Sequence, residues 1–407
     1  MGLISFLRAN APFLAAGALL AFCSSFGQTY LISVFAGVIR AEFGLSHGDW
    51  GLIYTAGTFA SAVVMLWAGV LTDHFRARVL GAVVLAMLAG ACVAMALVPG
   101  AWALPFVIFA LRLTGQGMTT HIAMVAMARW FVVSRGKALS IASLGIAAGE
   151  ALLPLASVAL LDEVPWRWLW LGFAAFAMLM VPVLARLLRL ERTPQAIAAE
   201  SQAAGMDGLH WTRRQALRHW LFWLMVPAIL APSAWSTAFF FQQVHLAETK
   251  GWSHLQLVAL FPLYTGVSVT AMLASGWVID RVGTARLMPL YQLPMAMGFV
   301  IIGTTEGLGL AALGMACMAV AQGANSTLPN AFWAEFYGTR HLGGVKAMAT
   351  AVMVLGSAIG PGLTGSLIDR GIIFADQMIG IAVYFVFAAV LVWIGVRRAR
   401  RLLPVAA

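Results

Sequence analysis

The stretch Gly69-Val-Leu-Thr-Asp73-His-Phe-Arg76-Ala-Arg78 decides the fold, because a second version of it occurs later in the chain. That version is Gly276-Trp-Val-Ile-Asp280-Arg281-Val-Gly283-Thr-Ala-Arg286. In both, a glycine precedes an aspartate by four residues, an apolar segment comes before, and basic residues follow. The two glycines are 207 positions apart in a chain of 407 residues. A charged turn between apolar helices, repeated at half-length, predicts two similar halves.

The composition predicts a membrane protein. Hydrophobic residues make up 62% of the chain and charged residues 10%, against about 45–50% and 25% in soluble domains, and the mean hydropathy is +0.90. Twelve apolar stretches are long enough to cross a hydrocarbon core about 30 Å thick. They are 12–38, 48–71, 79–99, 102–128, 137–161, 166–190, 219–247, 254–279, 286–304, 308–333, 344–368 and 375–396. The predicted fold is all-α, with twelve transmembrane helices in two pseudo-symmetric six-helix bundles.

Other repeated positions support the duplication. Gln116-Gly117 returns as Gln322-Gly323, 206 positions later, and Lys137 answers to Lys346, 209 positions later. Parallel repeats of this kind are a layout of secondary transporters, which bind substrate between the repeats near the membrane midplane. The expected division is a bundle over 1–190, a cytoplasmic linker over 191–218 and a bundle over 219–407.

The linker is the one long loop that the sequence predicts. Its middle, Thr193 to Gly208, is rich in Pro, Ala, Gln and Gly and is expected to be flexible. Thr212 to Arg218 is expected to form a short basic helix on the anionic inner leaflet, with Thr212 as its N-cap.

The net charge of +10 does not indicate nucleic-acid binding, because 20 of the 25 Lys and Arg residues fall on one side if both termini are cytoplasmic. The exceptions are Arg40, Arg167, Lys250 and Arg370 outside, and Arg112 within a helix. This positive-inside asymmetry sets the orientation. We expect a monomeric multi-pass protein of the bacterial inner membrane with both termini cytoplasmic. The first segment lacks a convincing cleavage site and is expected to be retained.

The sequence does not favour an enzyme, a cofactor or a metal site. Cys23, Cys92 and Cys317 lie inside apolar segments and are expected to be small core residues. The chain contains no G-x-S-x-G, H-E-x-x-H, P-loop or C-x-x-C motif. No loop is long enough for a soluble domain, so a membrane enzyme or a receptor is a remote alternative.

Arg112 and Glu150 are the two charged residues that sit clearly inside apolar segments. Each costs about 2.5–3.5 kcal/mol at a helix centre, so a partner or a watery cavity is expected. One interpretation is a structural ion pair between the fourth and fifth helices. The other is functional: Arg112 attracts an anionic substrate, and Glu150 is its mobile partner and a proton carrier. Met318 stands at the position that answers to Arg112 in the second half, so only one half has the pair, which favours function.

Further polar residues are candidates for the substrate or proton path. Gln28 and Tyr30 lie in the polar run of the first helix, where Gln28 is either a helix–helix contact or a cavity wall. His121 lies nine residues after Arg112, about half a turn round the helix, and is either a core histidine or a proton relay. Candidate substrate contacts in the second half are Trp235, Gln242, Gln322 and Asn325.

The chain resembles the major facilitator superfamily across nearly its whole length. The resemblance rests on the twelve segments and on the turn signature G-x-x-x-D-[RK]-x-G-[RK]-[RK]. The first copy departs from it, with His74 at a basic position and Arg76 at the glycine position, whereas the second keeps Asp280, Arg281 and Gly283. The resemblance implies a cytoplasmic gate. Its residues would be Gly69, Asp73, Arg76, Arg78, Gly276, Asp280, Arg281 and Arg286.

Two stretches resemble the monocarboxylate and oxalate–formate branch of that superfamily. They are Phe26-Gly-Gln-Thr-Tyr-Leu-Ile-Ser-Val-Phe35 and Phe239-Phe-Phe-Gln-Gln-Val-His245. Basic residues deep in helices 8 and 11, which the oxalate–formate carriers have, are missing here, and this argues against a dicarboxylate. We therefore expect a secondary active transporter that moves a small monocarboxylate-like anion by alternating access, with a proton or by exchange. The alternative within this class is proton-driven efflux of amphipathic compounds.

Overall fold

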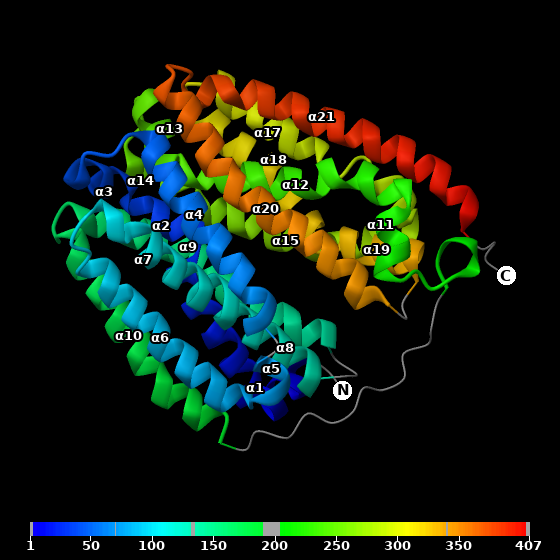
Figure 1. Cartoon of the computed structure of the whole chain (residues 1–407), viewed down its shortest axis with the longest axis horizontal. Coiled ribbons are helices and arrows are strands. Elements are labelled where there is room, and N and C mark those ends of the chain that lie inside the picture. The colour runs from blue at the N-terminus through cyan, green and yellow to red at the C-terminus, as the bar shows by residue number, and fades with distance from the viewer. Residues whose placement is uncertain (1–2, 70, 132–134, 190–203, 339–340, 404–407) are drawn as a thin grey trace. The chain divides into compact units, whose positions relative to one another are not determined.

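The computed structural model describes residues 3–69, 71–131, 135–189, 204–338 and 341–403. These residues form helices and connecting turns, as expected, in two compact units, Met1–Ala199 and Glu200–Ala407. In Figure 1 the colour runs from blue to green through the first unit and from green to red through the second.

The helices of the first unit follow the six expected segments. They are α1 (Leu3–Cys23), η1 (Ser24–Gly27), α2 (Thr29–Ile32), η2 (Ser33–Phe35), α3 (Ala36–Phe43), α4 (His47–Ala68), α5 (Leu71–His74), α6 (Ala77–Ala96), η3 (Ala101–Ala103), α7 (Leu104–Leu111), η4 (Arg112–Thr119), α8 (Thr120–Trp130), α9 (Arg135–Leu161) and α10 (Trp166–Leu187).

The second unit is built in the same way. Its helices are η5 (Met206–Gly208), α11 (Arg213–Arg218), α12 (Trp220–Phe241), α13 (Gln243–Thr249), α14 (His254–Val258), α15 (Phe261–Val282), α16 (Thr284–Leu287), α17 (Leu293–Thr304), α18 (Leu308–Asn325), α19 (Leu328–Tyr337), α20 (Leu342–Asp369), α21 (Phe374–Ala399) and η6 (Arg400–Leu402).

Within the described residues, nine helices are long and apolar enough to cross a membrane, or ten if the bent pair of 29–43 and 47–65 forms one span. The other two expected spans are also helical. One is the segment from α7 to α8, which changes helix type at Arg112. The other is α17, an apolar helix of 12 residues. Each of the twelve predicted segments therefore corresponds to helix in the structure.

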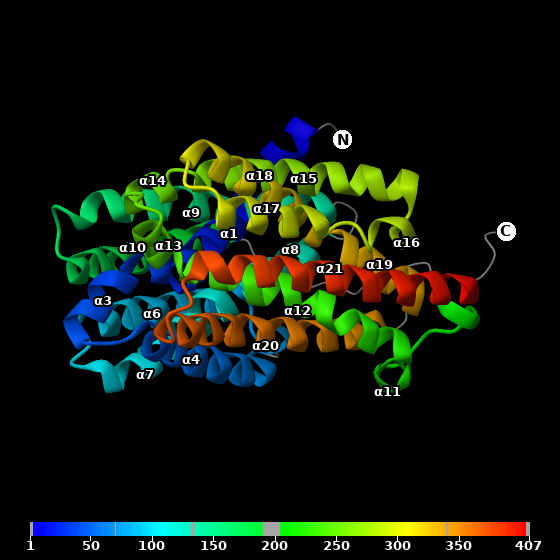
Figure 2. The same ribbon diagram turned by 90° about the horizontal axis from the view of Figure 1, so that it is seen from above.

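The packing inside each unit repeats, as the duplicated sequence predicts. In the first unit α1 packs against α9, and α6 packs against α10. The corresponding helices of the second unit make the same pairs, α12 with α20 and α17 with α21. Figures 1 and 2 show α12 beside both α20 and α21. Two glycines at matching positions of the repeat contact two methionines at matching positions. A Cβ on Gly117 would lie 3.2 Å from the sulfur of Met65, and a Cβ on Gly323 would lie 2.7 Å from the backbone nitrogen of Met272.

Short polar sequences fix where the helices begin and turn. Ser46 and Asp49 form a reciprocal capping box at the start of α4. Gly44, with φ 63°, ends α3 in the left-handed conformation that glycine adopts without strain. The predicted basic helix is present as α11, and Thr212 caps it together with Gln215.

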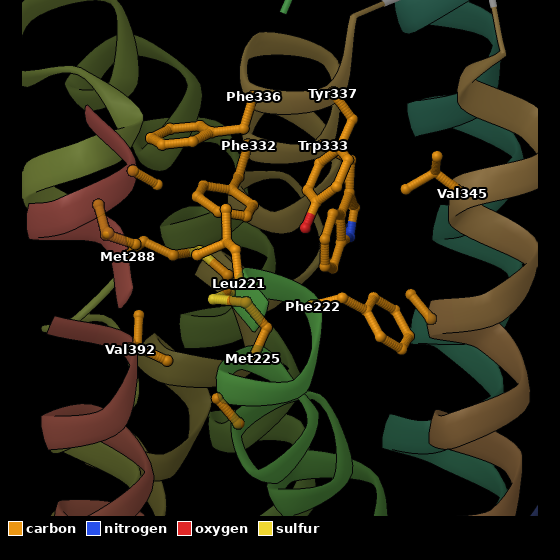
Figure 3. Packing of buried hydrophobic residues seen from close by; sticks show 14 of the residues in the cluster. Leu221, Phe222, Met225, Met288, Phe332, Trp333, Phe336, Tyr337, Val345 and Val392 are labelled. Carbon is orange, nitrogen blue, oxygen red and sulfur yellow. The ribbon is translucent and has the colours of Figure 1, made fainter. Parts of the chain in front are cut away.

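An aromatic core holds one end of the second unit together (Figure 3). It joins Phe332, Trp333, Phe336 and Tyr337 of α19 to Leu221, Phe222 and Met225 of α12, with Val345 of α20 and Val392 of α21. The end of the linker packs on this core, because Met206 is fully buried in it and the backbone N–H of Trp211 donates to the backbone carbonyl of Tyr337.

The predicted flexibility of Thr193 to Gly208 is therefore wrong for residues 204–208, and residues 193–203 lie outside the described part. The polar composition of the stretch suggested a solvated chain. However, Gly205 packs so closely that an added Cβ would lie 2.5 Å from the Gly338 nitrogen. This contact with the end of α19 orders a segment that has no helix or strand pattern of its own.

Candidate functional site

The first membrane helix is interrupted in its polar run. After η1 the residue Gln28 is extended, with φ −86° and ψ 150°, and the helix restarts at Thr29. Ser24 is bonded to the Ala21 carbonyl through its hydroxyl at 2.6 Å, a side-chain to backbone bond of the kind that competes with regular helix. An interruption frees backbone groups from the helical ladder, and inside a membrane they need other partners.

The fourth helix is also irregular where it faces this break. Arg112–Thr119 is π-helical, a form that occurs mostly as short insertions and often at functional sites. The two irregular segments touch backbone to backbone: a Cβ on Gly27 would lie 2.1 Å from the Leu111 carbonyl oxygen, and one on Gly115 would lie 2.6 Å from the Gly27 nitrogen. Glycine is required at both positions because no side chain fits between the helices.

Arg112 is held at this crossing by neutral groups. Its side chain is 1% exposed, and Nη1 donates to the Gly27 carbonyl at 3.1 Å and to Thr29 Oγ1 at 3.3 Å. The guanidinium lies 5.3 Å from the centre of the Tyr54 ring, and the Tyr54 hydroxyl is bonded to Thr29 Oγ1 at 2.5 Å. Within the described residues, Arg112 Nε has no hydrogen-bond partner.

The contacts described for Arg112 do not include Glu150, which was its expected partner. Glu150 is half-buried on α9 and lies within electrostatic range of Tyr30. The Tyr30 hydroxyl donates to Ser25 Oγ at 2.8 Å, and Gly149 lies against that serine. Both intramembrane charges therefore lie near the same interruption of the first helix, Arg112 at Gly27 and Thr29, and Glu150 at Tyr30.

This arrangement is suited to binding an anion. Burying a cation is costly unless an anion pairs with it. Among the described residues, the Arg112 guanidinium contacts carbonyl, hydroxyl and aromatic groups and no carboxylate. Arginine recognises carboxylates through paired N–H donors in one plane. A carboxylate that reached Nε and the second terminal nitrogen would supply both the missing charge and the missing acceptor.

His121 lies at the charged turn and not at the Arg112 crossing. Its Nε2 atom is 3.5 Å from Thr72 Oγ1 and 3.5 Å from the place of a Cβ on Gly69. Gly69 follows the last residue of α4, Arg76 precedes α6, and Arg78 lies in the first turn of α6; both arginine side chains are exposed. The side chain of Asp73 lies outside the described residues, so its predicted gating contacts stay a prediction.

The second copy of the turn has a different backbone. Gly283 ends α15 with φ 83° and ψ 154°, whereas Arg76, at the matching position, has φ −66° and ψ 142°. The first copy can therefore replace the signature glycine, because its turn does not need a positive φ. Arg281 stacks 3.6 Å from the centre of the Trp277 ring, and Thr284 donates a hydrogen bond to Glu335. Gly276 has open space beside it, and the Asp280 side chain lies outside the described residues.

The candidates in the second unit separate into two kinds. Gln242 is 3% exposed and donates to Thr364 Oγ1 at 3.1 Å, which ties α12 to α20. Asn325 accepts from the Tyr291 hydroxyl at 3.2 Å. In contrast, Trp235 Nε1 and Gln322 Oε1 are buried without a hydrogen-bond partner in the described part of the chain.

Sequence reasoning missed four residues that belong to these networks: Thr29, Tyr54, Tyr291 and Thr364. Each is a hydroxyl residue within an apolar helical segment. That signal is weak, because a hydroxyl in a helix can also bond to its own backbone.

The comparisons with known proteins identify the superfamily that the sequence resembles. The family model described as Major Facilitator Superfamily matches residues 17–361. The 3-(3-hydroxy-phenyl)propionate transporter of Escherichia coli (strain K12) is 25% identical over 390 residues, covering 91% of this chain and 90% of that protein. Monocarboxylate transporter 11 of Mus musculus is 28% identical over 300 residues, which are 70% of this chain and 65% of that protein.

Solved structures give the same fold. A bacterial homologue of the human lysosomal transporter Spinster, crystallised in an inward-facing and unoccupied conformation, superposes with a TM-score of 0.76. Its sequence is 15% identical, and the match covers 98% of this chain and 99% of that one. The same homologue in an inward-facing and occupied conformation gives a TM-score of 0.75 at 15% identity. At this identity the likeness concerns the fold alone.

Proposed function

Because this chain belongs to the major facilitator superfamily and is therefore a secondary transporter, not an enzyme, we propose that its cargo is a small organic anion with one carboxylate. The single observation that carries the proposal is Arg112, a buried cation whose described contacts are all neutral and whose Nε lacks a partner among the described residues. The relatives named for a phenylpropionate and for monocarboxylates support a cargo that combines an apolar body with one carboxylate.

The proposed roles rest on the contacts around the interruption of the first membrane helix after Gly27. Arg112 binds the carboxylate, and Thr29 and Tyr54 position the guanidinium through their shared hydrogen bond. Trp235 and Gln322 offer one free donor and one free acceptor in the second unit. Glu150, a half-buried carboxyl on α9 near Tyr30, carries the coupled proton, because an ionisable residue inside a membrane segment is by default a functional candidate. Transport proceeds by alternating access, as in other carriers with parallel repeats.

The test is uptake into proteoliposomes that contain the purified protein. Radiolabelled phenylpropionate and a short aliphatic monocarboxylate are compared with the amides of the same acids, with and without an inward-directed proton gradient. We expect the acids to accumulate and the amides not to compete. Arg112→Gln should abolish uptake, whereas Arg398→Gln, which removes an exposed arginine near the end of α21, should transport normally.

Two results would contradict the proposal. Equal competition by the amides would show that the carboxylate is not recognised. Gradient-driven extrusion of amphipathic cations with no uptake of acids would favour the efflux alternative. The proposed orientation in the bacterial inner membrane, with both termini cytoplasmic, is supported by the arginine distribution. Labelling of single cysteines placed near each end of the chain tests it separately.

A further inference from the structure

The second unit has a basic cavity at the end of α21 that the transport proposal does not use. Its volume is about 690 Å³, within the range of small-molecule sites. The lining residues that matter are Arg286, Leu290, Trp393, Arg397, Arg400 and Arg401. They come from α16 and the α16–α17 connection on one side and from α21 and η6 on the other. We propose that this cavity binds the headgroup of an anionic phospholipid of the cytoplasmic leaflet.

The charge of the cavity selects an anion. Four arginines line it and, among the described residues that line it, none is acidic. The structure gives these four arginines no carboxylate partner in the described part of the chain, and Arg397 stacks 5.2 Å from the centre of the Trp393 ring. Several guanidinium groups converging on one space match the oxygens of a phosphate, which arginine binds through two donors at once.

The depth of the cavity matches the headgroup region of a bilayer. Along α21, Trp393 lies about 29 Å from Phe374, which is the thickness of the hydrocarbon core. Arg397 to Arg401 lie about 35–41 Å from Phe374, at the level of the headgroups. A tryptophan at the boundary and arginines just beyond it are typical of a helix end at the membrane interface.

The apolar part of the lining favours a lipid over a soluble anion. Leu290 is 56% exposed and Trp393 is 50% exposed beside the arginines. These side chains provide a surface for the first carbons of an acyl chain, which a free phosphate does not have. Basic pockets between membrane helices on the cytoplasmic side bind anionic headgroups in this way.

The test is lipid retention by the full-length protein in detergent, measured by native mass spectrometry. Phosphatidylglycerol is compared with phosphatidylcholine of the same acyl chains, and glycerol phosphate is added as a soluble competitor. The variant Arg397→Gln, Arg400→Gln, Arg401→Gln is compared with Arg213→Gln, Arg214→Gln, Arg398→Gln. Each removes three cytoplasmic charges from the second unit, but the second set lies outside the cavity.

We expect wild type and the second variant to retain phosphatidylglycerol in preference to phosphatidylcholine, and the first variant to bind it roughly tenfold more weakly. If the first variant does not fold, Leu290→Asp places a negative charge at an exposed lining position and should produce the same loss. Equal loss in both triple variants, equal retention of the two lipids, or full displacement by millimolar glycerol phosphate would each overturn the proposal.

Discussion

Arg112 donates a hydrogen bond to the carbonyl oxygen of Gly27 at 3.1 Å, across 85 positions of sequence. The acceptor exists because the first helix is interrupted after Gly27, and the donor is brought to it because the fourth helix is π-helical from Arg112 onward. Two irregular segments thus support each other, and the charged side chain is fixed between them without a counter-ion among its described contacts.

The close approach of these helices predicts that one methyl group added at Gly27 lowers both stability and transport. Gly27→Ala would place a Cβ 2.1 Å from a backbone oxygen that cannot move alone, so the helices must separate. We expect a loss of stability of about 1–3 kcal/mol, the usual result of overpacking, and loss of transport because Arg112 loses its acceptor. Thermal unfolding and proteoliposome uptake measure the two effects.

Gly90→Ala is the matched control for that substitution. Gly90 lies inside α6 with nothing within 4 Å of an added Cβ, so alanine should leave transport unchanged and raise stability by at most about 1 kcal/mol. Indistinguishable unfolding temperatures for Gly27→Ala and Gly90→Ala would show that the crossing is less tightly packed than the structure indicates.

The free indole of Trp235 predicts a specific effect on substrate affinity. Trp235→Phe keeps an aromatic ring but removes the buried N–H that has no partner among the described residues. If this donor meets a polar group of the substrate, KM should rise about fivefold, the value of one hydrogen bond of about 1 kcal/mol, and the unfolding temperature should change little.

Thr364→Val should change stability and leave the substrate affinity unchanged, the reverse of the effect expected for Trp235→Phe. It removes the acceptor of Gln242 and should lower stability by about 1–3 kcal/mol, because a buried amide is left unsatisfied, while KM stays near the wild-type value. An unchanged KM in Trp235→Phe would remove Trp235 from the binding site.

Glu150 is the residue on which proton coupling depends in the proposed cycle. Glu150→Gln keeps the size of the side chain and its ability to form hydrogen bonds but cannot ionise. We expect the variant to lose accumulation driven by a proton gradient and to keep exchange of labelled for unlabelled substrate. Comparing the two assays on the same proteoliposomes separates coupling from binding, and a wild-type response to the gradient would assign the proton to another group.

The sequence was sufficient for the fold but not for the contacts of Arg112. The twelve apolar stretches, the duplicated turn and the Thr212 cap all reflect local composition or short spacing, which can be read residue by residue. The Glu150 pairing was inferred from depth alone, since position along a helix gives the depth of a side chain but not its direction. The interruption at Gln28 depends on the contact between Gly27 and Gly115, which lie far apart in the sequence. The residues around either glycine do not predict this contact by themselves.

His219, which caps α12 just before the membrane span Trp220–Phe241, predicts that the stability of the protein depends on pH. The Leu221 N–H donates to His219 Nδ1 at 3.4 Å, which requires a neutral ring, and the histidine packs on Trp211 at the end of the linker. Burial lowers the pKa of His219 from its ordinary value of 6.5, and Asp207 opposes the shift. Because the folded state has the lower pKa, the unfolded chain binds more protons between the two values, and stability rises with pH across that window. The contribution of His219 is therefore complete above about pH 6.5 and is lost as the pH falls through the folded pKa.

His219→Asn tests this mechanism, because asparagine is a good N-cap that does not titrate. We expect the unfolding temperature of wild type to fall more steeply than that of the variant between pH 7.5 and about pH 5. His341→Asn, at an exposed position of the same unit, should follow the wild-type curve. If instead wild type and His219→Asn lose stability in parallel, the imidazole is not held neutral by its place between the linker and α12, and the acid sensitivity arises elsewhere in the chain.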